Sequence, residues 1–402
     1  MQELSPTSLP RANSMAAPDI LVVSRTFLPD PGGIQEYVYN RCLQDCDRVI
    51  VLTAGCPGAQ SFDALQPFPI YRWPDFRFCR AFGPIGSLLK QVLYMVSAVF
   101  LSLKLFRRYR FRYIEWGHGY DFPAILLLSY LLPIQFFLYL HGDDLLCPAK
   151  NPLFQKVFQW TLNRAKATAC NSRFTQNHLN QKFAVPTPSY VIHPTVRPEK
   201  FGESTLLEQA SRLRAKVRQS YNIPAKAVVI LTVGRLVRRK GFDRVIKQLP
   251  ALTAAGLDVY YLVAGRGKLE AELRQLSADL KVADRVIFAG YVPDRQLAEF
   301  YAASDIFAML TFFDADSQSI EGFGIVYLEA GYFGKPVLAA QVGGVEDAVQ
   351  DGETGILVDP SSDLEVYTAL ERLCRDSGLR DRLGHQGQAL AHRSTPHRLL
   401  YQ

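Results

Sequence analysis

The sequence lacks several patterns that would assign it to a specialised class of protein. Its seven cysteines are irregularly spaced, with no CxxC pair, which argues against a disulfide framework and against a zinc knuckle. Residues 1–17, MQELSPTSLPRANSMAA, lack the basic start and apolar core of a secretory signal, and we expect a disordered tail there. A reducing, cytoplasmic location is therefore expected.

Long apolar runs are also scarce. One uncharged run, residues 122–140, has about the length that crosses a bilayer core, but Pro133 divides it. We predict a short buried helix in AILLLSYLL and a buried strand in PIQFFLYL, rather than a membrane span.

The composition indicates a globular protein with more than one domain. At 402 residues, with 48% hydrophobic and 21% charged residues, the chain suits two or three domains. Short β-branched runs such as DILVVS and AVVILTVG alternate with helical patterns, which predicts an α/β fold with two Rossmann-like, doubly wound parallel sheets. Prolines and polar residues around 194–205 predict the linker between them.

The net charge is modestly positive. The value of +7 suits phosphate-bearing ligands or an anionic membrane, and it does not by itself indicate nucleic acid.

The densest group of chemically useful residues is SIEGFGIVYLEA, residues 319–330. A helix is predicted to begin near Gly324, where its N-terminal amides and dipole would suit a phosphate. Glu321 precedes this helix and Glu329 lies within it. Such a spacing along a helix gives about 12 Å, whereas a glycosidase pair needs about 5 to 9.5 Å. We interpret the two as contacts for the ends of one extended ligand; the alternative is an acidic first turn and a solvated glutamate.

A basic loop, VGRLVRRKGF at residues 233–242, follows the first strand predicted for the second half. Arg235 and Lys240 are expected where that strand ends, and a guanidinium with an ammonium can neutralise a pyrophosphate there. We interpret Arg238 and Arg239 as solvated loop charges. The alternative for the whole loop is a solvent-facing turn without a ligand.

Two other strand ends give weaker signals. Gly32 and Gly33, in PGGI, open the first helix and leave amides that can approach a phosphate or an acceptor. His141 ends the apolar strand, and Asp143 and Asp144 follow it at the expected cleft edge. No further ligand cluster supports a metal site there, so no metal is expected.

The sequence GRGKLE, residues 265–270, differs from a dinucleotide fingerprint. Glu270 stands at the third glycine position, and the next predicted strand ends in Gly290 and Tyr291 without an acidic residue for a ribose. We predict a tight turn and no NAD site.

From residue 18 onward, the chain resembles the retaining GT-B glycosyltransferases of glycosyltransferase family 4. The resemblance rests, in order, on PGGIQEY, HGDD, NSRFT, VGRLVRRKGFD, GYVPDRQLAEFYAASDIF, EGFGIVYLEA, GKPVLA, GGVEDAV and GETGILVDP. It implies an acceptor-binding domain at 18–195, a nucleotide-sugar-binding domain at 196–385 and a C-terminal helix at 386–402 that returns towards the first domain. EGFGIVYLEA and RLVRRKG are most similar to GDP-mannose-dependent mannosyltransferases of the phosphatidylinositol-mannoside type.

The resemblance also implies a role for each matching residue. Arg235 and Lys240 match the pair that grips the donor diphosphate. Glu329 matches the glutamate that binds the nucleotide ribose, and Glu321 the one that holds the donor sugar's hydroxyls. The other matching positions are the phosphate cradle at Phe323, Gly324 and Ile325, the glycine loop at Gly32 and Gly33, the base contact at Val292, the sugar contact at His141, and Arg173.

We therefore expect a retaining hexosyltransferase that moves a sugar from a nucleotide-sugar to a lipid-linked or polysaccharide acceptor in cell-envelope or exopolysaccharide synthesis. The narrower resemblance implies mannose from GDP-mannose. Fixed positive charge would stabilise the departing diphosphate without a cofactor or metal. The alternatives are a UDP-sugar- or ADP-glucose-dependent transferase with a soluble acceptor, and a non-enzymatic basic module that binds membranes. No nucleic-acid partner is expected.

Residues 88–112 bear on the location of the acceptor. An apolar stretch, Val92–Leu103, precedes five basic residues: Lys104, Arg107, Arg108, Arg110 and Arg112. One interpretation is a buried helix with a basic end. The other is docking of Lys104–Arg112 on the inner face of an anionic membrane, where aromatic rings would lie at the headgroup level. Those rings are Phe106, Tyr109, Phe111 and Tyr113.

Overall fold

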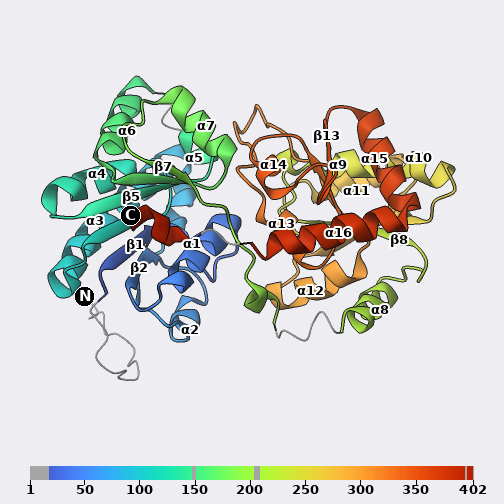
Figure 1. Ribbon diagram of the computed structural model, residues 1–402, viewed down its shortest axis with the longest axis horizontal. Helices are drawn as coiled ribbons and strands as arrows, with labels where there is room; N and C mark the ends of the chain where they lie inside the picture. Colours follow the sequence, from blue (N-terminus) through green and yellow to red (C-terminus); the bar gives the residue numbers. More distant parts are fainter. Residues whose placement is uncertain (1–17, 147–150, 203–208, 394–395, 402) are drawn as a thin grey trace. The chain divides into compact units, whose positions relative to one another are not determined.

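The computed structural model describes residues 18–146, 151–202, 209–393 and 396–401. The tail expected at residues 1–17 lies outside them. Two compact units make up the chain (Figure 1). Unit 1 comprises Met1–Asn171, Thr175–Ile192 and Pro396–Gln402, and unit 2 comprises Ser172–Phe174 and His193–Thr395.

Unit 1 is built on a seven-stranded parallel sheet in the order β3-β2-β1-β4-β5-β6-β7. The strands are β1 Ile20–Ser24, β2 Val49–Ala54, β3 Ile70–Trp73, β4 Tyr113–Trp116, β5 Gln135–Leu140, β6 Ala167–Cys170 and β7 Ser189–Val191. The helices are α1 Gly33–Gln44, α2 Ala59–Asp63, α3 Gly83–Tyr109, α4 Phe122–Leu131, α5 Asp143–Leu146, α6 Pro152–Arg164 and α7 Arg173–Lys182.

Unit 2 is built on a six-stranded parallel sheet in the order β10-β9-β8-β11-β12-β13. The strands are β8 Val228–Val233, β9 Val259–Ala264, β10 Val286–Gly290, β11 Ile306–Met309, β12 Val337–Ala340 and β13 Gly355–Val358. The helices are α8 Ala210–Ser220, α9 Phe242–Ile246, α10 Leu249–Ala254, α11 Glu270–Asp279, α12 Asp294–Ala303, α13 Ile325–Tyr332, α14 Val345–Ala348, α15 Asp363–Arg375 and α16 Ser377–Ala391.

Each sheet separates two apolar cores, which explains the nearly continuous hydrophobic runs of its strands. In β1, Leu21 and Val23 pack into one core, while Ile20 and Val22 pack into the core on the other face. Burying each such side chain contributes roughly 1.5–3 kcal/mol. The predicted α/β fold with two doubly wound parallel sheets is therefore confirmed.

The apolar run at residues 122–140 also divides as predicted. It forms α4 and β5 on either side of Pro133, and β5 lies between β4 and β6 inside the sheet of unit 1. Part of the segment expected to be a linker is instead packed structure. Pro198–Phe201 forms a 3₁₀ turn, and the side chain of Phe201 is buried in a core of unit 2.

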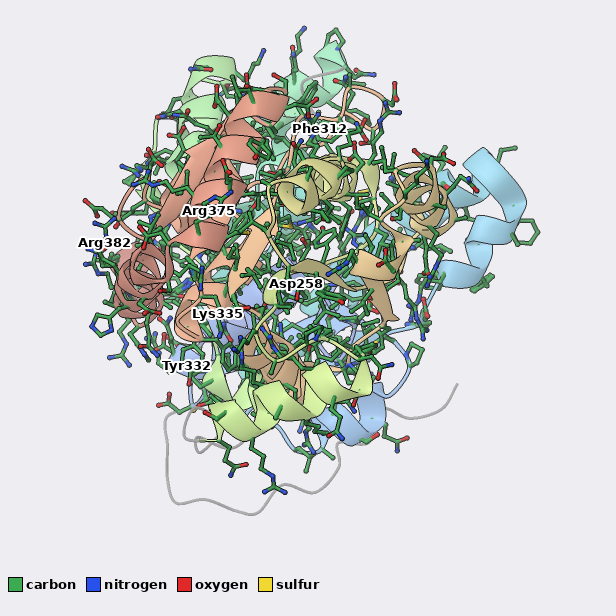
Figure 2. All side chains as sticks on the ribbon, turned by 90° about the vertical axis from the view of Figure 1, so that its right-hand side faces the viewer. Asp258, Phe312, Tyr332, Lys335, Arg375 and Arg382 are labelled. Carbon is green, nitrogen blue, oxygen red and sulfur yellow. The ribbon has the colours of Figure 1, made fainter. Side chains whose placement is uncertain are left out.

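The labelled side chains of unit 2 include exposed residues and one that joins two elements. Figure 2 shows Arg375 and Arg382 on α15 and α16, where both side chains are exposed. Lys335, also labelled, donates from Nζ to the carbonyl oxygen of Ser304 at 2.9 Å. Burial lowers the pKa of Lys335 to about 8. This bond fastens the turn before β12 to the end of α12.

The C-terminal residues return to unit 1 as a 3₁₀ helix, His397–Tyr401. The His397 ring stacks on Tyr139, with ring centroids 5.7 Å apart, and the Tyr401 hydroxyl donates to Glu115.

The strand order places the ligand-binding edge of each unit. In doubly wound sheets, ligands bind beyond the carboxyl ends of the strands at the point where the strand order reverses. That point lies between β1 and β4 in unit 1 and between β8 and β11 in unit 2. The basic loop follows β8, and the segment with Glu321 follows β11.

Candidate active site

The loop after β8 is held against the end of β11. Gly241 ends the 3₁₀ turn Arg238–Lys240 with a φ of 68°. A Cβ atom at this position would lie 1.9 Å from the carbonyl oxygen of Leu310, so only glycine fits here. This close approach brings the last residues of the basic loop next to the segment that follows β11.

Glu321 lies between two cationic side chains of that loop. Its Oε2 is 2.6 Å from Lys240 Nζ and 2.6 Å from Arg239 Nη1, and the three side chains are only 12–14% exposed. The pKa of Glu321 is lowered to about 2, because the attraction of Lys240 and Arg239 exceeds the effect of burial. Burial lowers the pKa of Lys240 despite its pairing with Glu321.

This cluster corrects one prediction and agrees with another. Arg239 was interpreted as a solvated loop charge, but the 3₁₀ turn directs it to Glu321 and leaves its side chain 14% exposed. The side chain of Arg238 is 69% exposed, as expected for a solvated residue. The sequence pattern does not distinguish two adjacent arginines. The geometry of the 3₁₀ turn decides which of them faces Glu321 and which faces solvent.

Arg235 adds a further positive charge. It follows β8, is exposed, and lies close enough to Lys240 to lower the pKa of that ammonium. No ion pair involves Arg235 within the part of the chain that the structure describes. Three cations therefore surround one carboxylate, and this excess of positive charge attracts an anion.

A second glycine without room for a side chain lies against the backbone of the Glu321 segment. The Gly344 amide donates to the carbonyl oxygen of Glu321 at 2.9 Å. A Cβ atom at position 344 would lie 1.9 Å from the carbonyl oxygen of Gly322. The loop before α14 therefore fixes the backbone that carries Glu321.

Helix α13 begins where the sequence predicts. Gly324 precedes it with a φ of 88°, and Ile325 is its first residue. Phe323 is buried, and the Tyr327 hydroxyl donates to the carbonyl oxygen of Met309 at 2.9 Å, which anchors the first turn to β11. The predicted cradle of Phe323, Gly324 and Ile325 thus lies at the positive end of an anchored helix.

Glu329 lies on α13 in a separate, buried cluster. Its Oε1 is 2.6 Å from Lys200 Nζ, and the Tyr301 hydroxyl donates to Oε2 at 3.0 Å. Burial and the Glu329 carboxylate raise the pKa of Tyr301 well above its ordinary value. Sequence reasoning missed Lys200, because it lies in the expected linker 129 positions before Glu329 and no motif marked it. The two glutamates therefore have different cationic partners.

Val292 occupies the short connection between β10 and α12. It is buried in the same apolar cluster as Phe323. The sharp turn expected at GRGKLE is present as well, since a Cβ atom at Gly265 would lie 1.8 Å from the carbonyl oxygen of Gly234. The ends of β8 and β9 are thereby held together.

The remaining predicted residues lie on unit 1 and α7. Gly32 and Gly33 are exposed at the start of α1, and Arg173 is the exposed first residue of α7. His141 is buried after β5, and its Nε2 donates to the carbonyl oxygen of Gly117 at 2.9 Å. Burial lowers the pKa of His141, so the ring is neutral at pH 7, with Nδ1 as an acceptor.

Of the two aspartates after His141, Asp144 is buried. Asp144 is 1% exposed and accepts from the amides of Gly119 and His141 at 2.8 and 2.9 Å. It shapes the loop rather than offering a carboxylate to a ligand. The described residues contain no group of three or more His, Cys, Asp or Glu side chains that could hold a metal ion.

Comparison with known families gives two adjacent matches. Residues 31–200 match the model described as Glycosyltransferase Family 4, and residues 214–390 match the one described as Glycosyl transferases group 1. A solved structure of HepE from Anabaena, in complex with UDP and glucose, has a similar fold, with a TM-score of 0.71 at 20% identity over 92% of this chain and 94% of that one.

Curated relatives include two mannosyltransferases. A GDP-mannose-dependent alpha-(1-6)-phosphatidylinositol monomannoside mannosyltransferase of Mycolicibacterium smegmatis is 32% identical over 53% of this chain and 54% of its own length. A GDP-mannose-dependent monoacylated alpha-(1-6)-phosphatidylinositol monomannoside mannosyltransferase of Corynebacterium glutamicum is 28% identical over 92% of both chains. The chain thus spans about half the length of the first of these relatives and nearly all of the second.

Proposed function

Because the chain belongs to the GT-B glycosyltransferases, we propose that it transfers mannose from GDP-mannose to a lipid-linked or polysaccharide acceptor with retention of configuration. The observation that carries the proposal is the charge cluster at the strand-order reversal of unit 2. There Lys240 and Arg239 hold Glu321, Arg235 is exposed beside them, and α13 begins a few residues later.

The cluster fits a donor that leaves as a nucleoside diphosphate. Negative charge grows on the diphosphate as the glycosidic bond breaks, so fixed cations stabilise the transition state more than the ground state. Arg235, Lys240 and the first amides of α13 supply this charge in our assignment, and Glu321 binds the sugar hydroxyls next to them. The diphosphate then leaves and the acceptor attacks on the same face of the sugar, through an oxocarbenium-like ion pair, so the anomeric configuration is retained.

The second cluster fits the nucleoside end. A carboxylate accepts from two neighbouring hydroxyls, and Glu329 lies beside Lys200 in a site that also holds Tyr301. Val292 is assigned to the base. The preference for GDP-mannose is supported by the names of relatives that use it.

Helix α3 supports an acceptor presented at a membrane. It is the one helix within the described residues that is long and apolar enough to span a bilayer, yet only 22% of its most apolar stretch is buried. Helices α4 and α6 pack in sequence beside it, α3 on α4 and α4 on α6. Their exposed apolar residues, which we call the apolar face, are Ile85, Leu88, Leu89, Val92, Val96 and Phe100 of α3, Leu127, Tyr130 and Leu131 of α4, and Leu153, Phe154 and Trp160 of α6.

We assign the apolar face to the surface of an anionic bilayer, with the protein on its cytoplasmic side. The exposed basic residues at the end of α3 complement anionic lipids. The aromatics expected at the headgroup level need correction, because Phe111 and Tyr113 are buried in the cores of unit 1. Tyr130 and Trp160, at 65% and 61% exposure, are amphipathic rings that remain available to an interface.

A donor screen tests the proposed reaction. Binding and slow hydrolysis are measured for GDP-mannose, UDP-glucose, UDP-N-acetylglucosamine and ADP-glucose at equal concentrations. We expect GDP-mannose to bind best and to release mannose with its original anomeric configuration, followed by NMR. Preferential hydrolysis of a UDP- or ADP-sugar would contradict the mannose assignment, and hydrolysis of none would contradict the proposed reaction.

A further inference from the structure

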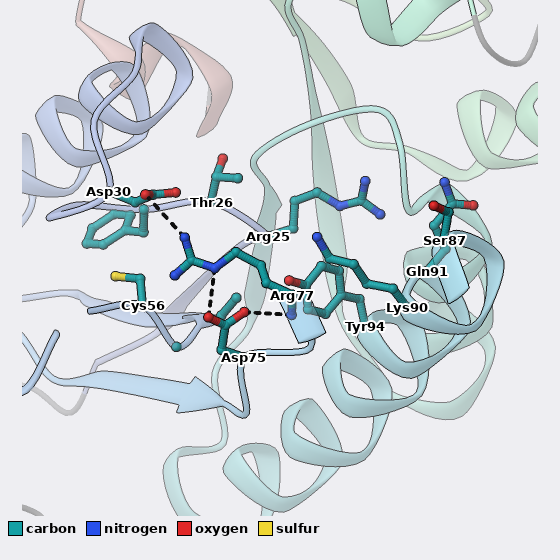
Figure 3. A pocket seen from close by; sticks show the side chains of 13 residues that line it. Arg25, Thr26, Asp30, Cys56, Asp75, Arg77, Ser87, Lys90, Gln91 and Tyr94 are labelled. Carbon is teal, nitrogen blue, oxygen red and sulfur yellow. Dashed lines mark hydrogen bonds and ion pairs between the residues drawn. The ribbon is translucent and has the colours of Figure 1, made fainter. Parts of the chain in front are cut away.

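Helix α3 borders two cavities in unit 1. The first lies beyond the carboxyl ends of β1, β2 and β3, and Figure 3 shows the side chains that line it. Its arginines are already paired, Arg77 with Asp75 at 2.7 Å and Arg25 with Asp121 at 2.5 Å. This cavity lies at the edge where doubly wound sheets bind their substrates, and the charges of its arginines are balanced within the protein.

The second cavity lies towards the other end of α3. Its volume is about 310 Å³, within the range of small-ligand sites, and it is lined by two residues of β3 and by α3 residues between 101 and 108. Lys90 lines the first cavity and Lys104 the second, so about 20 Å of helix separates them. Just after α3 ends, the Arg112 amide donates to the carbonyl oxygen of Asp19, directly before β1. The second cavity therefore lies towards the amino ends of the strands, away from the edge that binds substrates.

One wall of this second cavity is apolar. Leu101 and Leu105 lie one helical turn apart on α3 and line the cavity together with Tyr71 of β3. Leu105 is 5% exposed, and Leu101 and Tyr71 pack against the same core of unit 1. The hydroxyls of Tyr71 and Tyr109 are hydrogen-bonded to each other at 2.7 Å, so the polar ends of both rings are engaged. Hydrocarbon is the ligand surface that gains most from contact with such a wall.

The rim of the second cavity is basic. Lys104, Arg107 and Arg108 line it and are exposed. Among the residues that the structure describes, no carboxylate forms an ion pair with any of the three. Arg72 of β3 also lines the cavity but differs from them, because its guanidinium is paired with Asp63 at 2.7 Å. The cations of α3 thus attract an anionic group to the rim, and their charge is not balanced by a neighbouring ion pair.

We propose that the second cavity binds one hydrocarbon chain that ends in an anionic group, the chemistry shared by a fatty acid and an anionic membrane lipid. The chain contacts Leu101 and Leu105, and the anionic group lies at Lys104 and Arg107. An inorganic anion would leave the apolar wall uncovered, and an uncharged chain would leave the cations unmatched. Phe100 of the apolar face lies one turn before Lys104, so the rim adjoins the surface assigned to the membrane. The ligand holds the end of α3 and does not enter the reaction, so the inference goes beyond the proposed transfer.

Calorimetric titration of the full chain tests the ligand class. The probes are dodecanoate, dodecyltrimethylammonium, which has a chain of the same length and the opposite charge, and butanoate, which has the same charge and a short chain. All are kept below the concentrations at which they form micelles. We expect dodecanoate to bind at least about tenfold more tightly than the other two, because it alone matches both the apolar wall and the basic rim. Equal binding of dodecanoate and dodecyltrimethylammonium, or no binding of dodecanoate, overturns the proposal.

Two cavity variants and two controls locate the ligand. Leu101→Trp fills the cavity and should weaken dodecanoate binding at least about tenfold. Lys104→Gln combined with Arg107→Gln should remove the preference for dodecanoate over dodecyltrimethylammonium, because it removes the charge-assisted contacts. Lys182→Gln, which removes an exposed lysine of α7, and Val96→Ser, on the apolar face, are the matched controls and should bind like the wild type. Wild-type affinity and preference in both cavity variants, with their melting temperatures unchanged, place the ligand elsewhere and overturn the assignment.

Vesicles distinguish the two sources of such a chain. Sedimentation of the wild type and of Leu101→Trp is compared on vesicles of phosphatidylcholine with phosphatidylglycerol, at the same total lipid. If the chain comes from a membrane lipid, Leu101→Trp weakens binding to these vesicles as well as binding of dodecanoate. Unchanged vesicle binding, with dodecanoate binding weakened, assigns the cavity to a free fatty acid. If Leu101→Trp weakens neither, the cavity holds no hydrocarbon chain and the proposal is overturned, whatever the donor measurements show.

Discussion

At the residue scale, the electrostatics of the basic loop determine the expected catalysis. Lys240→Ala and Arg235→Ala should each lower kcat/KM by ~10²-fold or more, because each removes a preorganised charge next to the leaving diphosphate. Arg238→Ala is the control, since that side chain is 69% exposed on the same turn. Steady-state kinetics with the preferred donor measure the effect, and wild-type rates in both variants would exclude these roles.

The two glutamates should separate binding from transfer. Glu329→Gln removes the charge assigned to the ribose and should weaken the binding of free GDP about tenfold. Asp294, 3.8 Å from Lys200, remains as a carboxylate partner for that ammonium. Glu321→Gln should bind free GDP almost as well as the wild type and suppress transfer. Calorimetry and kinetics on the same preparations test both, and equal GDP affinity in wild type and Glu329→Gln would refute the ribose contact.

Glu321 also couples stability to pH. Its pKa of about 2 is lower than its ordinary value of 4.5, so its ionised pairing stabilises the fold above pH 4.5. This contribution is lost as the pH falls from 4.5 to 2, and by linkage it amounts to about 3 kcal/mol. The unfolding midpoint in denaturant should therefore differ between wild type and Glu321→Gln at pH 6 and converge near pH 2. A constant difference over this range would show that the pairing is not formed.

At the element scale, the sequence predicts the boundaries of helices and strands that depend on local pattern. It misses side-chain contacts that depend on how distant segments pack together. The division of 122–140 follows from Pro133, and the start of α13 follows from Gly324, both local features. Lys200 reaches Glu329 only because the turn containing Phe201 packs into unit 2. The pattern at 88–112 fits a core helix and a surface helix equally well, because the sequence does not indicate whether other elements pack over this helix.

Helix α3 gives the prediction at this scale. Replacing Arg107, Arg108, Arg110 and Arg112 with Gln should abolish sedimentation with anionic vesicles, because each basic residue near the surface contributes about 1 kcal/mol. Wild-type binding should weaken with salt and should be absent on neutral vesicles. Val96→Ser with Phe100→Ser, two exposed positions of the apolar face, should weaken binding with less effect on the salt dependence. Equal binding to neutral and anionic vesicles, or binding to neither, would remove the membrane assignment.

At the scale of the whole molecule, the two units divide the proposed work. The residues assigned to the diphosphate and the nucleoside, from Arg235 to Glu329, lie in unit 2, while the apolar face assigned to the membrane lies in unit 1. Both units share one sheet topology, yet their strand ends carry different chemistry. Nucleotide binding and membrane binding are thus separate measurements on one chain.

The final prediction concerns metal. Positive charge from the chain already lies where we assign the diphosphate. It comes from Arg235, Lys240 and the amides at the start of α13, so a divalent cation is not needed to neutralise the leaving group. We expect transfer by the full chain to keep its rate in excess EDTA, measured as nucleotide release at saturating donor. Added Mg²⁺ or Mn²⁺ should change the rate less than about twofold, because a cation would compete with Lys240 and Arg235 for the same oxygens. Loss of activity in EDTA that either ion restores would show that metal is required and that the chain's own charges are insufficient.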